Sequence, residues 1–545
     1  MPAPSHWNRR REGKVPPRSC RGRRAPLLLL ALALVGLFVA LPGCGSSQAV
    51  RPSIVVIQLD DQDLYDLGAT YRSRSGRIVR VLPNMRRLMV DAGVTFNNYY
   101  VSVPVCCPSR AALLTGRYAR NNGVFTNVGA IGGFDAYRRH DLHANVAVWL
   151  QKAGYRTIHV GKFLNGYSSR PATVPPGWSD WQTLATDPST SFYYGYQFND
   201  NGRITRRYGD RGYRIVDSAR CPHHSSRRCN YVTDVLTAKA LRALRRTPSS
   251  RPFYLQVDYT APHVDDHGPI GPPPPPRYLH SLAGIRAPRV PDFNEADVSD
   301  KPSFVRRSPQ LAPNDIRRVD VRYEARLESE RAVDDGLGAL IRTLRRLGRL
   351  PNTYVFLTSD NGYFQGEHRF ATGKFLPYET ANHMPLLVRG PGIPTGQRSD
   401  ALSANVDLAL TFLQISGGRP TSPLDGESLL HYARDPALQS RRAVLLEDFT
   451  KAPRQTAGRS FGPPSSRVPH AYTGIRVGPY KYIQYATGER ELYNLNRDPY
   501  ELRSLAANPR YRNVVAWLAE RLKALAICSG HPCRRPVGPI PRPLR

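Results

Sequence analysis

The sequence predicts an α/β fold in which a mostly parallel β-sheet is covered by helices on both faces, followed by a smaller α+β subdomain. Three observations support this prediction. Short apolar runs alternate with stretches whose apolar residues recur at helical spacing. Each run leads into polar residues. The chain has 545 residues, of which 41% are hydrophobic, so it can bury a large core.

Residues 1–44 have the pattern of an export signal. A basic region precedes an uninterrupted apolar run at residues 27–41, which is short for a membrane span. The following Leu-Pro-Gly-Cys resembles a bacterial lipoprotein cleavage site, and Cys44 would then be the lipidated first residue of a protein anchored at the outer face of the cell membrane. Pro42 is unusual in that position, and ordinary secretion with cleavage nearby is the alternative.

Four apolar runs are the predicted central strands. Such runs are typical of strands buried on both faces of a parallel sheet. The runs, with the polar residue toward which each leads, are 54–59 before Asp60, 157–160 before Lys162, 253–257 before His263 and 354–357 before Asp360. Ligands of such sheets bind beyond the carboxyl ends of the strands, so we expect the functional site there.

Helices are predicted between these strands and after them. Residues 145–153 and 323–347 have apolar residues at helical spacing. A Pro-rich region at residues 272–302 interrupts the pattern and is expected to be a surface excursion. The expected boundaries are a large domain over residues 45–440, a C-terminal subdomain with an antiparallel sheet over residues 441–533, and a disordered tail over residues 534–545.

The net charge of +34 is compatible with a nucleic acid, an anionic membrane surface or an acidic polymer as partner. Most of the positive charge is Arg spread along the whole chain. The sequence has no zinc-finger spacing and no aromatic pattern of an RNA-binding module, so specific nucleic-acid recognition is not expected. Membrane contact is expected only through the lipid anchor, and the sequence does not predict an oligomeric state.

Export makes disulfides available to the remaining cysteines. Two short-range pairs are candidate disulfides, Cys221 with Cys229 and Cys528 with Cys533. Metal binding by these four residues is not favoured, because no Cys-x-x-Cys spacing occurs among them.

The most informative stretch is residues 106–117, which read Cys-Cys-Pro-Ser-Arg-Ala-Ala-Leu-Leu-Thr-Gly-Arg. Two buried thiols before a helix are the simple alternative. The stretch resembles the signature of the sulfatase family, Cys-x-Pro-x-Arg, whose leading Cys is oxidised to formylglycine. Pro108 and Arg110 lie two and four residues after Cys106, so Cys106 rather than Cys107 is the residue that matches.

Asp60-Asp61 and Asp360-Asn361 offer hard oxygen ligands of the kind that Ca²⁺ or Mg²⁺ prefers. Carboxylates at strand ends are also common as turn formers. The resemblance implies that these four residues, with formylglycine at 106, bind one divalent cation, with Ca²⁺ favoured over Mg²⁺. It also implies an alkaline-phosphatase-like large domain and maturation of Cys106 by a formylglycine-generating enzyme.

Further residues match the family in order along the chain. The resemblance implies that Lys162 and Lys374 contact the sulfate, that Arg110 holds the nucleophile and the metal-bound carboxylates, and that His263 protonates the leaving alcohol. Many sulfatases have a His two residues after the first Lys, but this chain has Leu164. His368 is therefore a candidate substitute for that His, and a structural role or a contact with the substrate is equally compatible with its sequence context.

The implied function is hydrolysis of a sulfate ester, in which a hydroxyl of hydrated formylglycine attacks sulfur. The motifs are closest to the N-acetylglucosamine-6-sulfatase-like branch, so a sulfated sugar or glycosaminoglycan is the expected substrate. Three alternatives remain open: an arylsulfatase, a phosphate or phosphonate ester hydrolase of the same superfamily, and a polyanion-binding surface lipoprotein with an unmodified Cys106.

Overall fold

The computed structural model describes residues 51–73, 76–167, 173–185, 192–206, 208, 230–265, 270–449 and 471–545. The export signal, Cys44 and the Cys221–Cys229 pair lie outside the described residues. From residue 51 onward the described chain belongs to one compact unit. No helix among the described residues is long and apolar enough to cross a membrane.

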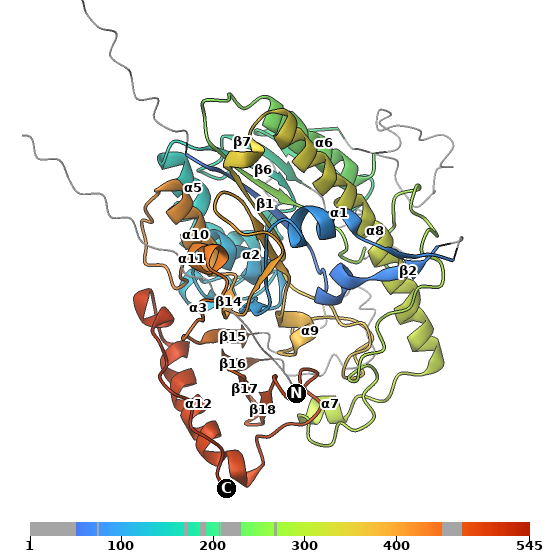
Figure 1. Cartoon of the computed structure of the whole chain (residues 1–545), viewed down its shortest axis with the longest axis vertical. Coiled ribbons are helices and arrows are strands. Elements are labelled where there is room, and N and C mark those ends of the chain that lie inside the picture. Colours follow the sequence, from blue (N-terminus) through green and yellow to red (C-terminus); the bar gives the residue numbers. More distant parts are fainter. Residues whose placement is uncertain are drawn as a thin grey trace, which may run out of the picture. The chain divides into compact units, whose positions relative to one another are not determined.

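A ten-stranded sheet forms the centre of this unit (Figure 1). Its middle strands β11, β1, β10, β6 and β7 run parallel, and antiparallel strands join at both sides. In sheet order the strands are β13 (Gln397–Ser399), β4 (Val94–Phe96), β12 (Leu386–Arg389), β11 (Thr353–Ser359), β1 (Ser53–Leu59), β10 (Phe253–Asp258), β6 (Arg156–Gly161), β7 (Asp180–Leu184), β8 (Phe198–Asp200) and β9 (Arg203–Ile204). The four apolar runs are thus the strands β1, β6, β10 and β11, as expected.

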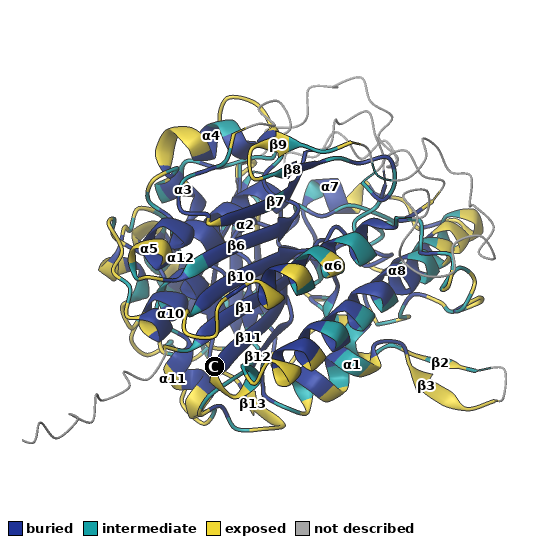
Figure 2. Ribbon diagram, turned by 90° about the horizontal axis from the view of Figure 1, so that it is seen from above, coloured by how far each residue is buried: buried dark blue, intermediate teal, exposed yellow. Residues whose placement is uncertain are grey.

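Helices cover both faces of the sheet, and β1 shows why (Figure 2). Its side chains alternate, so Ile54 and Val56 pack into one core cluster, while Val55, Ile57 and Leu59 pack into the other. The first face carries α2 (Cys106–Thr115), α4 (Gly133–His140), α5 (Val146–Lys152), α10 (Asp407–Ser416) and α11 (Leu430–Arg434). The second carries α1 (Pro83–Met85), α6 (Val232–Arg245) and α8 (Pro313–Arg346).

Local sequence explains the helix boundaries. Asn145 caps α5 by accepting hydrogen bonds from the backbone N–H groups of Ala147 and Val148. The long α8 begins with Pro313, which suits the first helical position. Helix α2 ends at Gly116, whose φ of 65° is the left-handed conformation that glycine adopts without strain. The Pro-rich region contains no helix or strand over residues 270–302, in agreement with the expected excursion.

A second, antiparallel sheet lies in the C-terminal part. It comprises β15 (Val444–Asp448), β16 (Tyr472–Val477), β17 (Tyr480–Tyr485) and β18 (Arg490–Asn494), and α12 (Arg512–Ala526) packs on it. The remaining short elements are β2 (Thr70–Arg72), β3 (Ile78–Arg80), β5 (Tyr99–Tyr100), β14 (Ser403–Ala404), α3 (Ala119–Asn122), α7 (Ser303–Arg306) and α9 (Glu379–Asn382). Cys528 and Cys533 form the expected disulfide, with Cα atoms 5.2 Å apart.

The tail after residue 533 differs from the expected disorder. The Val537 N–H donates to the Arg441 carbonyl at 3.0 Å, and the Leu544 N–H donates to the Arg510 carbonyl at 2.7 Å. Ile540 packs against the core of the C-terminal sheet. Composition alone predicted disorder, but the tail buries an apolar side chain and forms backbone hydrogen bonds with the rest of the chain.

Candidate active site

The carboxyl ends of four neighbouring strands bring the predicted site residues together. In the sheet register Leu59 pairs with Ser359, so Asp60 and Asp360 emerge side by side. On the other side of β1 lies β10, and β6 lies beyond it. Gly161 of β6 pairs with Asp258 of β10, so Lys162, which follows β6, lies at the same edge of the sheet. Glycine is required at 161, because a Cβ there would lie 2.0 Å from the Asp258 carbonyl oxygen.

Asp61 and Asn361 face each other across the same edge. The Asn361 Nδ2 donates to Asp61 Oδ1 at 2.5 Å, and the Asp61 N–H donates to Asp360 Oδ1 at 3.2 Å. Asp61 has a φ of 70°, an uncommon conformation for a residue with a side chain, which points to a functional constraint. Two oxygens of this group, Asp61 Oδ2 and Asn361 Oδ1, are buried and accept no hydrogen bond.

Cys106 is the first residue of α2, and only 1% of its surface is exposed. Its Sγ lies 3.0 Å from Lys374 Nζ, 3.8 Å from Lys162 Nζ and 3.5 Å from Asp60 Oδ1. The two ammonium groups also form ion pairs, Lys162 with Asp60 and Lys374 with Asp61. A helix N-terminus and two buried lysines at one atom form a strong anion-binding arrangement.

The cysteine itself is not activated as a thiolate. Burial and the neighbouring Asp60 raise the pKa of the Cys106 thiol to about 12, in spite of the two lysines. A thiol with this pKa stays protonated near neutral pH and is a weak nucleophile. The unmodified side chain is therefore poorly suited to act as a nucleophile.

Arg110 lies one turn further along α2 and holds the strand-end carboxylates in place. Its Nε donates to Asp360 Oδ2 at 2.8 Å, and its Nη2 lies 3.4 Å from Asp60 Oδ2. Its Nη1 lies 3.6 Å from Asp258 Oδ1 and donates to the Lys162 carbonyl at 3.3 Å. One buried guanidinium thus joins the ends of four strands of the sheet, β11, β1, β10 and β6, to the helix that carries Cys106.

The carboxylates beside Arg110 have shifted pKa values. Burial favours the neutral form of Asp60, but Lys162, His263 and Arg110 outweigh it and hold the pKa of Asp60 below its usual range. Burial and Asp60 raise the pKa of Asp360 to about 6. Shifts of opposite direction in adjacent carboxyls are typical of functional sites.

His263 closes the group on the side of β10. Asp60, Asp61, Cys106 and His263 each offer one ligand-type atom, and these atoms lie within 4.8 Å of one another. The His263 Nδ1 lies 2.6 Å from the Val264 carbonyl, and its Nε2 lies 3.8 Å from Asp61 Oδ2. Its Nε2 is therefore the ring nitrogen that faces the cluster.

The oxygen atoms at these strand ends fit a divalent cation. Three carboxylates and one amide are hard oxygen donors. Asp61 Oδ2 and Asn361 Oδ1 are buried and accept no hydrogen bond within the described chain, which leaves them free to bind a cation. Asp60, Asp61, Asp360 and Asn361 are therefore the candidate ligands of such an ion.

Two sequence-predicted positions lie outside this cluster. His368 is buried, with Nδ1 2.7 Å from Glu295 Oε2 and its ring 4.0 Å from the ring of Tyr378. Its hydrogen bonds and ion pairs go to Glu295 and Asp292 rather than to the residues around Cys106. Leu164 packs in the apolar core and is 3% exposed.

The sequence prediction missed Arg326 of α8. Its Nη2 donates to the Asp61 carbonyl at 2.5 Å, and its Nη1 donates to the Pro262 carbonyl at 3.3 Å. The side chain is fully buried and joins the loop that carries Asp61 to the loop that carries His263. A signal was present, because Arg326 falls on the apolar face of α8 beside Leu327.

The fold and this cluster together define a hydrolase of the alkaline-phosphatase-like class. A family model described as Sulfatase matches residues 52–418, and a model described as N-sulphoglucosamine sulphohydrolase, C-terminal, matches residues 366–527. The chain therefore belongs to the sulfatase family and is a sulfuric ester hydrolase.

Named relatives agree with this assignment. An arylsulfatase of Volvox carteri is 32% identical over 555 residues, which cover 93% of this chain and 79% of the relative. N-acetylglucosamine-6-sulfatase of Homo sapiens is 30% identical over 540 residues, which cover 94% of this chain and 90% of the relative. A putative extracellular sulfatase of Caenorhabditis elegans is 32% identical over 381 residues, which cover 69% of this chain but 48% of the relative.

Solved structures share the fold. A sulfatase in complex with its substrate D-glucosamine-2-N,6-O-disulfate superposes with a TM-score of 0.67 at 23% identity, covering 87% of this chain and 97% of that one. The phosphonate monoester hydrolase of Agrobacterium radiobacter superposes with a TM-score of 0.59 at 20% identity, covering 87% of this chain and 95% of that one. Both likenesses concern the architecture.

Proposed function

We propose that the chain hydrolyses sulfate esters of a sugar, with residue 106 oxidised to formylglycine as the nucleophile and a divalent cation bound at the strand ends. The observation that carries the proposal is the position of Cys106. It begins a helix, lies within hydrogen-bond range of two buried lysines and Asp60, and has a raised pKa that makes the unmodified thiol inert.

Each contacting side chain has a role in this proposal. Hydrated formylglycine would supply a hydroxyl nucleophile. Asp60, Asp61, Asp360 and Asn361 would hold the cation, which would supply Lewis-acid stabilisation of the sulfate charge. Lys162 and Lys374 neutralise the sulfate beside residue 106. Arg110 fixes the carboxylates Asp60 and Asp360 relative to α2.

His263 is the proposed proton carrier. Its Nε2 faces the cluster, so it can give a proton to the departing alcohol. After that step the imidazole is neutral, so it can accept a proton when sulfate is released. This double use removes the need for a base at Leu164, which lies in the core, or at His368, which is engaged by two carboxyls.

The proposed substrate is a sulfated sugar of a glycosaminoglycan-like polymer, and the 6-sulfate of glucosamine is the first ester to test. Two relatives support this choice, because one is named an N-acetylglucosamine-6-sulfatase and one solved structure of the same fold holds a glucosamine disulfate. The net charge of +34 would concentrate such a polyanion near the enzyme. An arylsulfatase relative and a phosphonate hydrolase of the same fold define the competing substrates.

The deciding experiment measures the state of residue 106 and the choice of ester in protein from its native host. Mass spectrometry of the peptide with residues 106 and 107 should show an aldehyde at 106 and a thiol at 107. Hydrolysis of sulfate, phosphate and phosphonate esters of one alcohol should favour the sulfate. The Cys106→Ala variant should lose activity and Cys107→Ala should keep it. A free thiol at 106 in active enzyme would refute the mechanism.

Ca²⁺ is the proposed cation, since the donors are all hard oxygens and Ca²⁺ accepts such donors in flexible geometry. Removal of metal with a chelator should abolish activity, and Ca²⁺ should restore it at lower concentration than Mg²⁺. Recovery with Mg²⁺ alone would reverse the assignment.

We also propose export, membrane anchoring and maturation of the chain, of which the first two concern residues outside the described chain. The signal pattern of residues 1–44 and the extracellular relative support export. We propose that a formylglycine-generating enzyme acts on Cys106, that Cys44 carries a lipid, and that Cys221 pairs with Cys229. Release of a Cys44→Ala variant from the membrane fraction into the medium would support the anchor, whereas an unchanged distribution would refute it.

A further inference from the structure

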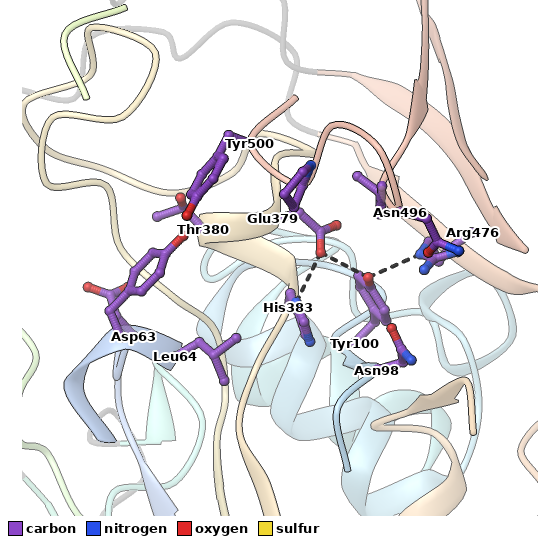
Figure 3. A pocket seen from close by; sticks show the side chains of 13 residues that line it. Asp63, Leu64, Asn98, Tyr100, Glu379, Thr380, His383, Arg476, Asn496 and Tyr500 are labelled. Atoms are coloured by element: carbon purple, nitrogen blue, oxygen red, sulfur yellow. Dashed lines mark hydrogen bonds and ion pairs between the residues drawn. The ribbon is translucent and has the colours of Figure 1, made fainter. Parts of the chain in front are cut away.

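A cavity of about 250 Å³ lies where the catalytic part meets the C-terminal sheet (Figure 3). One wall comes from the loop after β1, from residues near β5 and from α9. The other comes from β16 and the segment after β18. Its polar lining includes Asn98, Tyr100, Glu379, His383, Arg476 and Asn496.

The polar groups of this cavity are held in fixed orientations. The Arg476 Nε donates to the Tyr100 hydroxyl at 3.0 Å, and that hydroxyl donates to Glu379 Oε2 at 2.9 Å. The His383 Nδ1 lies 3.0 Å from the same carboxylate oxygen. Lys481 Nζ binds the other oxygen of Glu379 at 2.9 Å. A lining fixed in this way is preorganised for a ligand.

One guanidinium at the cavity has no carboxylate in contact with it. Lys481 forms ion pairs with both Glu379 and Glu501. Arg476 is 4% exposed, and its remaining bonds are from Nη1 to the Gly478 and Tyr480 carbonyls. Among the described residues no carboxylate lies within ion-pair distance of it. A buried guanidinium that borders a cavity in this way favours an anionic ligand.

The same cavity has aromatic and apolar lining. Tyr65, which is 37% exposed, and Tyr500 contribute rings, and Leu64 and Pro499 add apolar surface. In the view of Figure 3, Tyr500 lies beside Thr380, away from Arg476 and Asn496. A ligand with an anionic group and an apolar ring face matches this combination.

The cavity is close to the proposed metal site along the chain. Asp63 of the lining lies two residues after Asp61, so their Cα atoms are at most about 7 Å apart. The Asp63 carboxylate is itself occupied, because it accepts from the Tyr363 N–H at 3.0 Å and from Gln365 Nε2 at 2.6 Å. It therefore holds the loop after β1, which lines the cavity, to the segment that follows β11.

We propose that this cavity binds an acidic sugar unit of the polymer whose sulfate ester is cleaved at residue 106. This proposal rests on the proposed function and extends it, since it makes the enzyme specific for chains with a carboxylate or sulfate on a second sugar. The anionic group binds Arg476, and the sugar ring packs on Tyr500.

Kinetics on two substrates test the proposal. The variants Asn496→Ala and Tyr500→Ala alter the rim of the cavity, where neither side chain has a hydrogen bond within the described chain. Each should raise KM about fivefold to tenfold for a sulfated oligosaccharide with an acidic second sugar. Neither should change the kinetics of 4-nitrophenyl sulfate. Arg497→Ala is the matched control, because it removes an exposed charge beside the cavity without altering the lining.

Equal effects on both substrates, or none on the oligosaccharide, would overturn the proposal. Binding of D-glucuronate, glucose and inorganic sulfate is measured on the Cys106→Ala variant, which cannot turn over a substrate. This measurement tests the cavity independently of the proposed function. Glucuronate should perturb NMR signals of the cavity in the absence of turnover, and Tyr500→Ala should weaken that effect. Binding of sulfate without glucuronate would reduce the cavity to a simple anion site and refute the sugar assignment.

Discussion

Replacement of Lys374 by Met tests how much of the catalytic power resides in the two lysines beside residue 106. Lys374 is buried, and its Nζ lies 3.0 Å from Cys106 Sγ. A sulfate under attack at residue 106 must lie within about 4 Å of this ammonium. Methionine keeps most of the volume and removes the charge, so the variant isolates the electrostatic contribution.

The structure sets the size of the effect. Two unit charges about 4 Å apart interact by about 4 kcal/mol at an effective dielectric constant of about 20. Asp61 already neutralises part of the charge of Lys374, since the two form an ion pair. We therefore expect a loss of about 10²- to 10³-fold in kcat/KM, which corresponds to about 3 to 4 kcal/mol.

The assay is initial-rate hydrolysis of 4-nitrophenyl sulfate, with residue 106 verified as aldehyde in each preparation. Lys301→Met is the control, because Lys301 is also buried and paired with a carboxylate, Glu295 at 3.2 Å, but does not contact Cys106. The control should lose stability without a comparable loss in kcat/KM. A Lys374→Met enzyme within tenfold of the parent, or a control equally impaired, would refute the electrostatic argument.

Two further predictions concern buried charges elsewhere. Arg326→Gln removes the hydrogen bonds to the Asp61 and Pro262 carbonyls. Half-maximal activity should then require at least about tenfold more Ca²⁺ when metal-free enzyme is titrated with the ion. An unchanged titration would contradict a positioning role for Arg326. Burial raises the pKa of Glu447 to about 7 despite its pairing with Arg120. The folded state therefore binds this proton more tightly than the unfolded chain does. As a consequence, the free energy of unfolding falls as pH rises from about 4.5 to 7. In urea titrations, Glu447→Gln should reduce the stability lost between pH 5 and 8 by about 2 to 3 kcal/mol, and equal losses in both proteins would exclude this carboxyl as the cause.

The convergence of the site could be predicted because it depends on local sequence and one topological rule. Apolar runs that end in Asp60, Lys162 and Asp360 are recognisable without a structure, and parallel strands bring their carboxyl ends together. The start of α2 at Cys106 also follows from nearby residues. These features depend on contacts within a few residues or on the sheet register.

Features set by distant packing were not predictable. His368 was expected at the site, but its position is fixed by Glu295, which is far from it in sequence. The place of Arg326 on the apolar face of α8 indicates burial, but its two carbonyl partners, at Asp61 and Pro262, are distant in sequence and could not be predicted. The tail was expected to be disordered because of its high Pro and Arg content. The packing of Ile540 could not be predicted, because its partners lie on the C-terminal sheet.

The burial of residue 106 also sets an order of events in the life of the protein. Because only 1% of Cys106 is exposed, a modifying enzyme could not bind the thiol and its neighbours in the folded chain. The proposed oxidation must therefore occur while the stretch 106–117 is still extended. Activity would then depend on biogenesis, since a molecule that folds before this oxidation would keep its fold but permanently lack its nucleophile.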